Sequence, residues 1–388
     1  MRYLLLFVLL VFNPLLTFGQ TVDETDVISP DNVEELEALR SWQSGDEGFV
    51  AGTFSHAGDL LALALNDGVV KLIDTASWEV ISVLEGANLE GTQIQFSRDD
   101  SRLMLSHWDG MIRVWDLTAG ELILSVDAPS TYTWYEIDAD LRNYWTRADD
   151  GLRMQVIGTD IVSFQSIPMP NPVVLDLHPD GNLMAIVTET EEDHLLLYDL
   201  VAEEVVSEYT LDVDADLNGV GFSPDGGLVW ASWQDWLYSR SENPSVIRFW
   251  SVNTGMEQFE LIGDGSSYSR IIFDPNGDMV AVAGENSSLQ NVLQIWHLQT
   301  GEYIGDAGVP TGGGIGNFSP NGELFVLQGG TTPNVHIWNA KTPARPVDVM
   351  LEVGSGPNSV PIFSPDGRHI LTVNGATIRL WGVPAFDE

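Results

Sequence analysis

The stretch Phe222–Gly226, which reads FSPDG, decides the fold of this chain because near copies of it recur along the sequence. Phe363–Gly367 repeats it unchanged, and Phe318–Gly322 differs only by Asn in place of Asp. Proline presets the first central dihedral angle of a tight turn, and Gly or Asn tolerates the positive φ needed later in the turn. Each copy is therefore predicted to form a hairpin turn between two strands. The copies begin at Phe54, Phe96, Ile137, Leu177, Phe222, Phe273, Phe318 and Phe363.

A second mark, usually an aromatic residue at the end of a short apolar run, lies 18 to 28 residues after the start of each turn. Its sequence context is typical of a strand, because Met111–Asp116 alternates between an apolar and a mixed face. A further strand is predicted after it, as in Glu121–Val126. Only the third repeat lacks the mark and has Met154–Val156 in its place. The marks are Ile73, Trp115, Tyr198, Trp250, Trp296, Trp338 and Trp381.

Four strands in a repeat of about 40 to 45 residues, with an aromatic–Asp pair, resemble the WD-repeat family of β-propellers in a secreted, bacterial-type form. The resemblance runs from about Asn32 to Trp381. It departs from the family pattern because the Gly-His pair before the first strand is absent, so the buried His–Ser–Asp–Trp network is incomplete. The second repeat keeps possible members of that network in Ser106, Asp109 and Trp115.

Eight turns predict an all-β chain with one propeller of eight four-stranded blades. Seven blades is the alternative if the degenerate third repeat forms none. The eighth repeat ends after its third strand, at Trp381, so the ring needs one more strand to close. We expect Leu36–Trp42 to supply it, although the Glu, Leu and Ala residues nearby favour helix.

Composition excludes several classes of function. The chain has 388 residues, 57 acidic and 16 basic side chains, a net charge of −41 and no cysteine. Such a charge repels nucleic acid and anionic membrane surfaces. Without cysteine there is no disulfide, thiol nucleophile or zinc–thiolate site. With 44% hydrophobic residues, the composition indicates a soluble, well-cored protein with an acidic surface.

The N-terminus predicts export. Residues 1–20 combine one positive charge, a short apolar core and small residues before a cleavage point, which is typical of a signal peptide. An uncleaved N-terminal anchor is the alternative. Residues 21–31 are predicted to be a flexible lead-in and residues 32–388 the propeller. We therefore expect a secreted or extracytoplasmic monomer that does not insert into a membrane after signal cleavage.

Motifs for catalysis are missing from the sequence, which has no nucleophile elbow, Walker loop or His-Glu-x-x-His motif. We therefore expect no catalytic residue, no cofactor and a non-enzymatic scaffold for an unknown protein partner. The alternatives are a propeller enzyme or a carbohydrate-binding module, acting on extracellular glycans or peptides. An enzyme would need convergent charged side chains at the central channel, and no such cluster has recognisable spacing.

The partner site is expected on the fifth repeat, whose extra length falls between its second and third strands. That insertion is rich in aromatic residues, and long loops on rigid scaffolds tend to carry recognition. An acidic loop is expected on the same face. Asp214, Asp216 and Asn218, with Asp225 at the twelfth position, also form a weak candidate calcium loop. The predicted partner-binding residues are Trp233, Trp236, Tyr238, Arg240, Asp214 and Asp216.

Overall fold

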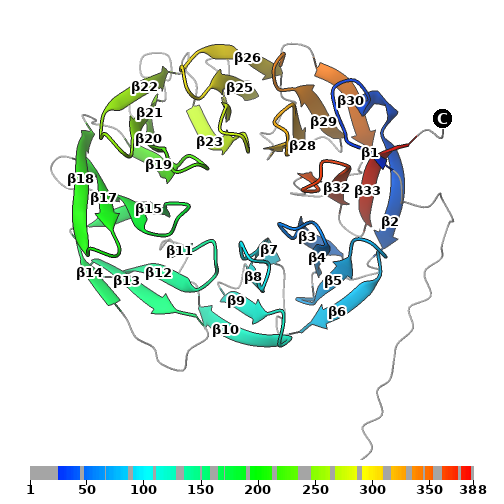
Figure 1. The fold of residues 1–388 in the computed structure, drawn as a ribbon, viewed down its shortest axis with the longest axis horizontal. Helices are drawn as coiled ribbons and strands as arrows, with labels where there is room; N and C mark the ends of the chain where they lie inside the picture. The colour runs from blue at the N-terminus through cyan, green and yellow to red at the C-terminus, as the bar shows by residue number, and fades with distance from the viewer. Residues whose placement is uncertain are drawn as a thin grey trace, which may run out of the picture.

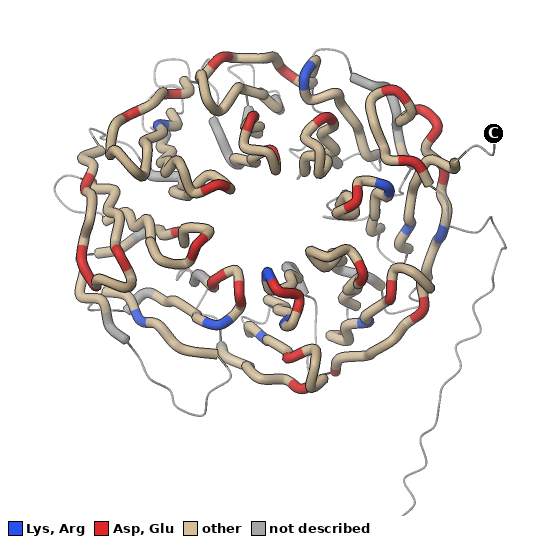
Figure 2. The backbone as a smooth tube through the Cα atoms, in the orientation of Figure 1, with Lys and Arg blue, Asp and Glu red and all other residues tan. Residues whose placement is uncertain are grey.

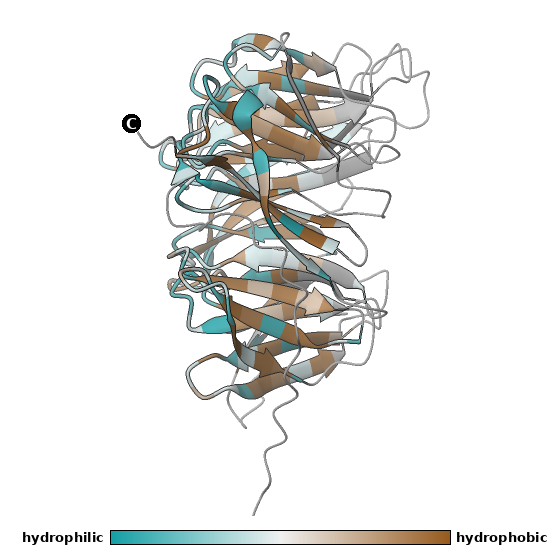
Figure 3. Cartoon of the chain, turned by 90° about the vertical axis from the view of Figure 1, so that its right-hand side faces the viewer, coloured by the Kyte–Doolittle hydropathy of each residue, from teal (hydrophilic) through white to brown (hydrophobic). Residues whose placement is uncertain are grey.

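The protein is a closed ring of eight antiparallel sheets in a computed structural model (Figure 1). Its strands run between the two faces of the ring, and apolar residues concentrate along them (Figure 3). The described residues include no helix with the length and apolar character needed to span a membrane. The structure describes residues 25–43, 48–65, 67–85, 91–107, 111–127, 135–148, 151–157, 165–169, 171–188, 193–211, 216–234, 246–262, 267–285, 291–308, 316–328, 334–343, 346–352, 361–374 and 377–385.

Each of the first four blades runs from an inner to an outer strand in chain order (Figure 1). Blade 1 contains β3 (Phe49–Phe54), β4 (Leu60–Leu65), β5 (Val70–Asp74) and β6 (Val80–Leu84). Blade 2 contains β7 (Gly91–Phe96), β8 (Arg102–His107), β9 (Met111–Asp116) and β10 (Glu121–Asp127). Blade 3 contains β11 (Tyr135–Ile137), β12 (Asn143–Ala148), β13 (Gly151–Val156) and β14 (Gln165–Pro168). Blade 4 contains β15 (Pro172–Leu177), β16 (Leu183–Thr188), β17 (Asp193–Asp199) and β18 (Glu204–Leu211).

The other blades follow the same order, except that the eighth uses strands from both ends of the chain. Blade 5 contains β19 (Asp216–Phe222), β20 (Leu228–Gln234), β21 (Val246–Ser251) and β22 (Glu257–Ile262). Blade 6 contains β23 (Ser267–Phe273), β24 (Met279–Glu285), β25 (Asn291–His297) and β26 (Tyr303–Gly308). Blade 7 contains β27 (Gly316–Phe318), β28 (Leu324–Gln328), β29 (Asn334–Asn339) and β30 (Pro346–Glu352). Blade 8 contains β31 (Ile362–Phe363), β32 (His369–Asn374), β33 (Thr377–Pro384), β2 (Glu37–Gln43) and β1 (Thr25–Asp26).

The degenerate third repeat is a full blade, which settles the count at eight. Its third strand, β13, contains the Met154–Val156 segment and pairs with β12 and β14. Gln155 lies opposite Tyr144, where other blades place the aromatic mark. Strand pairing therefore tolerates loss of the mark, because the ladder is formed by backbone groups.

The predicted closure is confirmed. β2 pairs antiparallel with β33, Ala38 opposite Trp381 and Trp42 opposite Ile378. Helix-favouring composition produces only one turn of 3₁₀ helix before it, η1 (Val33–Glu35). Tertiary pairing overrides local propensity here, because β33 would otherwise be left with an unpaired edge.

The segment predicted to be a flexible lead-in differs from that expectation from Thr25 onward. Thr25 and Asp26 form β1, which pairs with the end of β33. Ile28 is buried between blades 7 and 8, and its backbone N–H donates to the Gly367 carbonyl at 2.9 Å. This packing could not be predicted from the sequence, because a two-residue strand has no visible period.

The turn serine is buried in five blades and organises the turn. Ser223 Oγ accepts a hydrogen bond from the Leu228 N–H at 2.9 Å and donates one to Asp225 Oδ1 at 2.6 Å. Such bonds satisfy polar groups that the tight packing of the turn removes from water. Similar arrangements are built around Ser55, Ser97, Ser319 and Ser364.

The hydrophobic core lies in the seams between blades. The buried apolar residues form eight clusters, and each joins two neighbouring blades. The turn phenylalanines and third-strand tryptophans meet there, as in the seam of blades 4 and 5, where Phe222 and Trp250 pack with Tyr209. Side-chain stacking between blades therefore makes a rigid ring on which a functional site can be carried.

Candidate interaction site

Trp233, predicted to be a surface anchor, belongs to the core. Its side chain is buried in the seam between blades 4 and 5. The Arg248 guanidinium lies 5.1 Å from the centre of its ring, and Arg248 Nη2 contacts Glu260 Oε2 at 2.8 Å. A ring held by a cation on one side and core residues on the other has no free face for a partner. This corrects the role expected for Trp233, and the physical reason is that Trp233 belongs to β20, an inner strand whose two faces both pack against neighbouring blades.

The rest of the predicted site begins where β20 ends. Trp236, Tyr238 and Arg240 lie outside the described residues, as does Asp214. The backbone of Asp216 starts β19 and is paired with Gln234, the last residue of β20. The start of β19 and the end of β20 therefore lie side by side at one rim of blade 5.

The candidate calcium loop is not a continuous loop. Asp216 and Asn218 lie in β19, which is extended and paired with β20, and Asp225 lies in the turn at the other end of that strand. A calcium loop of this type must curl its ligands around one ion, which seven residues of paired strand prevent. Among the described residues, no group of three or more His, Asp or Glu side chains could hold a metal.

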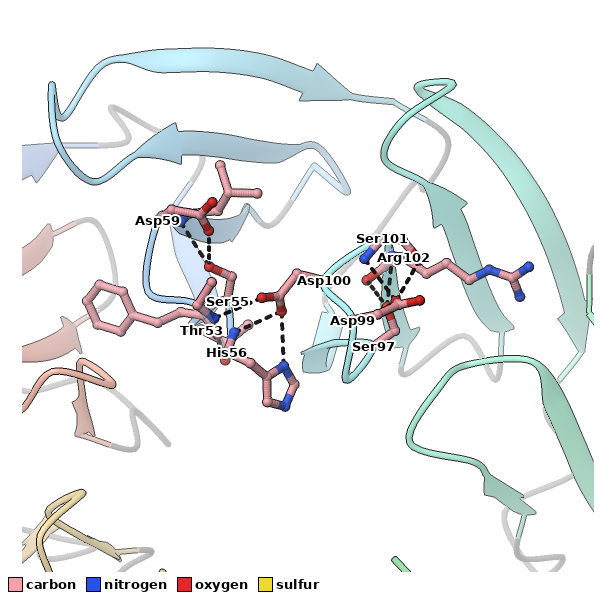
Figure 4. Close-up of polar contacts among 12 residues, drawn as sticks. Thr53, Ser55, His56, Asp59, Ser97, Asp99, Asp100, Ser101 and Arg102 are labelled. Atoms are coloured by element: carbon pink, nitrogen blue, oxygen red, sulfur yellow. Dashed lines mark hydrogen bonds and ion pairs between the residues drawn. The ribbon is translucent and has the colours of Figure 1, made fainter. Parts of the chain in front are cut away.

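The turns of blades 1 and 2 form the clearest polar cluster (Figure 4). Asp100 accepts hydrogen bonds from the backbone N–H groups of His56 and Ala57, both at 2.8 Å, and contacts His56 Nδ1 at 3.0 Å. Ser55 Oγ donates instead to Asp59 Oδ1 at 2.8 Å. The serine and the His–Asp pair therefore belong to separate networks, and the cluster fixes one turn against the next.

Several carboxylates in the blade turns accept hydrogen bonds of this kind. Hydrogen bonds from Ser101 and Ser97 lower the pKa of Asp99 to about 2, and a bond from Ser223 lowers the pKa of Asp225. Acidic residues occur on the inner turns and on the outer strands around the ring (Figure 2). The negative charge is therefore a property of the whole surface and not of one tail.

Asp176 is the exception among these acids. It lies on β15, and its Oδ2 accepts a hydrogen bond from the Phe222 N–H of the next blade at 2.9 Å. Burial raises the pKa of its carboxyl to about 6, against the opposing hydrogen bonds from Phe222 and Leu177. This group joins blades 4 and 5 and titrates above the usual range of a carboxylate.

Sequence reasoning missed a repeated position of cations. A basic side chain stands two residues before the third-strand mark, or its equivalent, in five blades, and aligning the repeats on that mark would have revealed it. Arg248, for example, lies over the Trp233 ring and forms an ion pair with Glu260 of the outer strand β22. The five residues are Lys71, Arg113, Arg153, Arg248 and Arg379.

Comparison with known proteins agrees with this architecture. Residues 52–137 match the family model of the anaphase-promoting complex subunit 4 WD40 domain. The β-propeller domain of Cps50 (Swd1) from Myceliophteria thermophila superposes with a TM-score of 0.54, at 15% identity, covering 90% of this chain and 99% of that one. The chain folds as a β-propeller, and its residues 52–137 are similar to a WD40 domain. That match covers most of blade 1, all of blade 2 and the first strand of blade 3, and it includes the polar turn cluster.

The similar curated proteins are larger than the matched region. The U3 small nucleolar RNA-associated protein 21 homolog of Schizosaccharomyces pombe is 34% identical over 80 residues, which are 21% of this chain and 9% of that protein. The WD repeat-containing protein WDS homolog of Arabidopsis thaliana is 24% identical over 340 residues, 85% of this chain and 54% of that protein. The propeller thus spans about half or less of these relatives. They are eukaryotic, so the bacterial-type secreted form stays a prediction.

Proposed function

We propose that this WD40 propeller is a secreted, monomeric and non-enzymatic scaffold that captures an extracellular protein partner at the rim of blade 5. Eleven residues separate β20 from β21, whereas the corresponding strands of other blades are separated by five or fewer. That difference is the observation that carries the proposal, because long connections on a rigid scaffold tend to carry recognition. Its sequence contains Trp236, Tyr238 and Arg240, residue types that are enriched at binding hot spots.

The net charge of the protein narrows the class of partner that it can bind. A net charge of −41 disfavours polyanions, so a neutral or basic protein surface is the expected counterpart. Asp214 and Asp216 at the same rim would add to this selection. The apolar run in residues 1–20 supports export, which would place that partner outside the cytoplasm.

The test uses the immobilised mature protein, challenged with extracellular proteins and with glycans. The double substitution Trp236→Ala with Tyr238→Ala should weaken capture of the partner by about tenfold or more. Tyr303→Ala, which removes an exposed aromatic ring from β26, is the control and should leave capture unchanged. Trp233→Ala is unsuitable, because loss of a core ring would destabilise the seam of blades 4 and 5.

Two results would contradict this assignment. Unchanged capture by the double variant would move the site away from blade 5. Capture of glycans in place of proteins would favour the carbohydrate-binding alternative. Thermal melting of each variant should match the parent protein, so that a change in capture reports on binding and not on folding.

A further inference from the structure

The outer strand of blade 1, β6, presents three branched apolar side chains to solvent. Val80, Ile81 and Val83 are each about half exposed, and Ile81 is the most exposed of the three at 58%. Among the described residues, β6 pairs only with β5, and it lies on the outer rim of the ring (Figure 1). An exposed apolar edge strand is a template on which another extended chain can pair.

Protection by charge is present on six of the other outer strands but absent from β6. An acidic residue occurs within β10, β18, β22, β26, β30 and β2, and charges of this kind discourage pairing at an edge. The sequence of β6, VISVL, contains none. Strand β14 is also uncharged, but its one large apolar residue, Ile167, is buried. β6 therefore combines features that the rest of the ring avoids.

Ile81, the most exposed of the three, lies at a bulge in β6. Leu72 pairs with Ser82 and Ile73 with Val80, so that Ile81 is the extra residue between them. The same bulge occurs in β18, where Val206 is the extra residue and is 47% exposed. β18 differs because it carries Glu204 and Glu208. Register shifts of this kind also occur in β2, β10, β22, β26 and β30, so the bulge is a general feature of the outer strands and the missing charge is what distinguishes β6 from β18.

We propose that the outer edge of β6 binds an extended, apolar segment of a protein partner that has Lys or Arg residues at both ends. Exposed Glu79 and Glu85 flank the strand on its two sides, so cationic ends would lie beside carboxylates. Added strands of this kind gain affinity from main-chain hydrogen bonds and specificity from alternate side chains. This surface is separate from the rim of blade 5 and extends the scaffold to a second binding position.

A second copy of the chain fits this edge poorly. In an antiparallel pair of two β6 strands centred on Ser82, Glu79 of one copy would lie opposite Glu85 of the other, at both ends. Like charges directly opposite each other destabilise a strand pair. The net charge of −41 on each copy adds to the repulsion. Charge complementarity therefore selects a partner with a basic, apolar strand.

The experiment uses the whole mature protein and a synthetic peptide, KKVTITVKK, as the probe. Its control is KKVTPTVKK, which keeps the charge but cannot maintain the strand. Titration should give binding of the first peptide and at least about tenfold weaker binding of the second. Hydrogen exchange at the β6 amides should slow on binding, because an added strand protects them.

Two matched substitutions separate pairing from simple charge attraction. Ile81→Glu should weaken binding by about tenfold although it adds a negative charge that attracts the peptide. Val206→Glu, at the equivalent bulge in β18, should leave binding unchanged. Equal or tighter binding by Ile81→Glu would overturn the proposal, and so would absence of amide protection in β6.

Sedimentation of the protein alone tests whether a second copy of the chain binds this edge. A concentration-dependent dimer that Ile81→Glu abolishes would assign the edge to a second copy and overturn the partner proposed here. The scaffold proposal is judged independently, because its test depends on Trp236 and Tyr238. If the peptide does not bind the protein but the blade 5 variant still loses partner capture, only the β6 site is rejected.

Discussion

At the scale of single residues, the turns show how closely neighbouring blades approach. Gly226 has a φ of +71°, and a Cβ atom added there would overlap the His178 ring of the preceding blade. His178 Nε2 lies 3.0 Å from the Gly226 carbonyl oxygen, and its ring meets Phe222 edge-on at 5.0 Å between ring centres. Glycine is required at this position for two reasons, the left-handed backbone and the close approach.

The prediction is that Gly226→Ala destabilises the protein more than Gly277→Ala. Gly277 has nearly the same φ, +73°, but no atom lies within 4 Å of its added Cβ. Both substitutions cost about 1 kcal/mol for the left-handed backbone, and Gly226→Ala should cost a further 1–3 kcal/mol for displacing His178. Urea unfolding measures the difference. Equal midpoints would show that His178 moves aside without loss.

The buried carboxyl of Asp176 predicts a pH dependence. Its pKa is raised to about 6 in the folded state, so folding disfavours the charged form. The cost is absent below about pH 4, develops as the pH rises from about 4 to 6, and is complete above it. Asp176→Asn should therefore stabilise the protein at pH 8 by about 1–3 kcal/mol and change little at pH 4.

Denaturant unfolding of both proteins at pH 4, 6 and 8 checks this prediction. The difference between them isolates Asp176 from carboxyls such as Asp99, whose lowered pKa acts in the opposite direction at acid pH. Lower stability of Asp176→Asn at pH 8 would mean that hydrogen bonds to the carboxylate outweigh its burial.

At the scale of elements, blade 8 is assembled from both ends of the chain. β33 pairs along its length first with β2 and then with β1. The strand at residues 36–42 could be predicted, because the eighth repeat shows only three strands of its own and ring closure requires a fourth. β1 could not, because two residues carry no pattern and the apolar pair Val27-Ile28 is too short to show a period.

Ile28→Ala should weaken this closure. Ile28 is 1% exposed and packs between blades 7 and 8, so its truncation should cost about 2–5 kcal/mol. Val27→Ala is the matched control, because Val27 is 43% exposed, and it should cost less than about 0.5 kcal/mol. The urea midpoints of the two variants make the comparison. A small effect of both would show that the segment before η1 contributes little to the ring.

At the scale of the whole molecule, the repeat made the architecture predictable. Turn signatures, five of them with Pro and Gly, indicated the first hairpin of each blade. Their spacing favoured eight blades but left seven open, because Gln155 replaces the aromatic residue in the third repeat. The site was less predictable. Trp233 appeared to belong to a surface loop, but β20 extends through it and both faces of that strand pack against neighbouring blades. Exposure of Ile81 was equally hidden, because a short apolar run such as VISVL does not show which of its residues face solvent.

The pairing of β2 with β33 also sets an order of assembly. The strand made among the first residues of the ring finds its partner only after more than 330 residues have followed it. Until β33 is made, β2 has no partner, so an emerging chain can build seven blades and still be open. The last step joins the most distant parts of the sequence, and such non-local contacts form slowly. A chain arrested before β33 therefore exposes the apolar faces of blades 1 and 7 together, which is the state that a cell's quality control would meet.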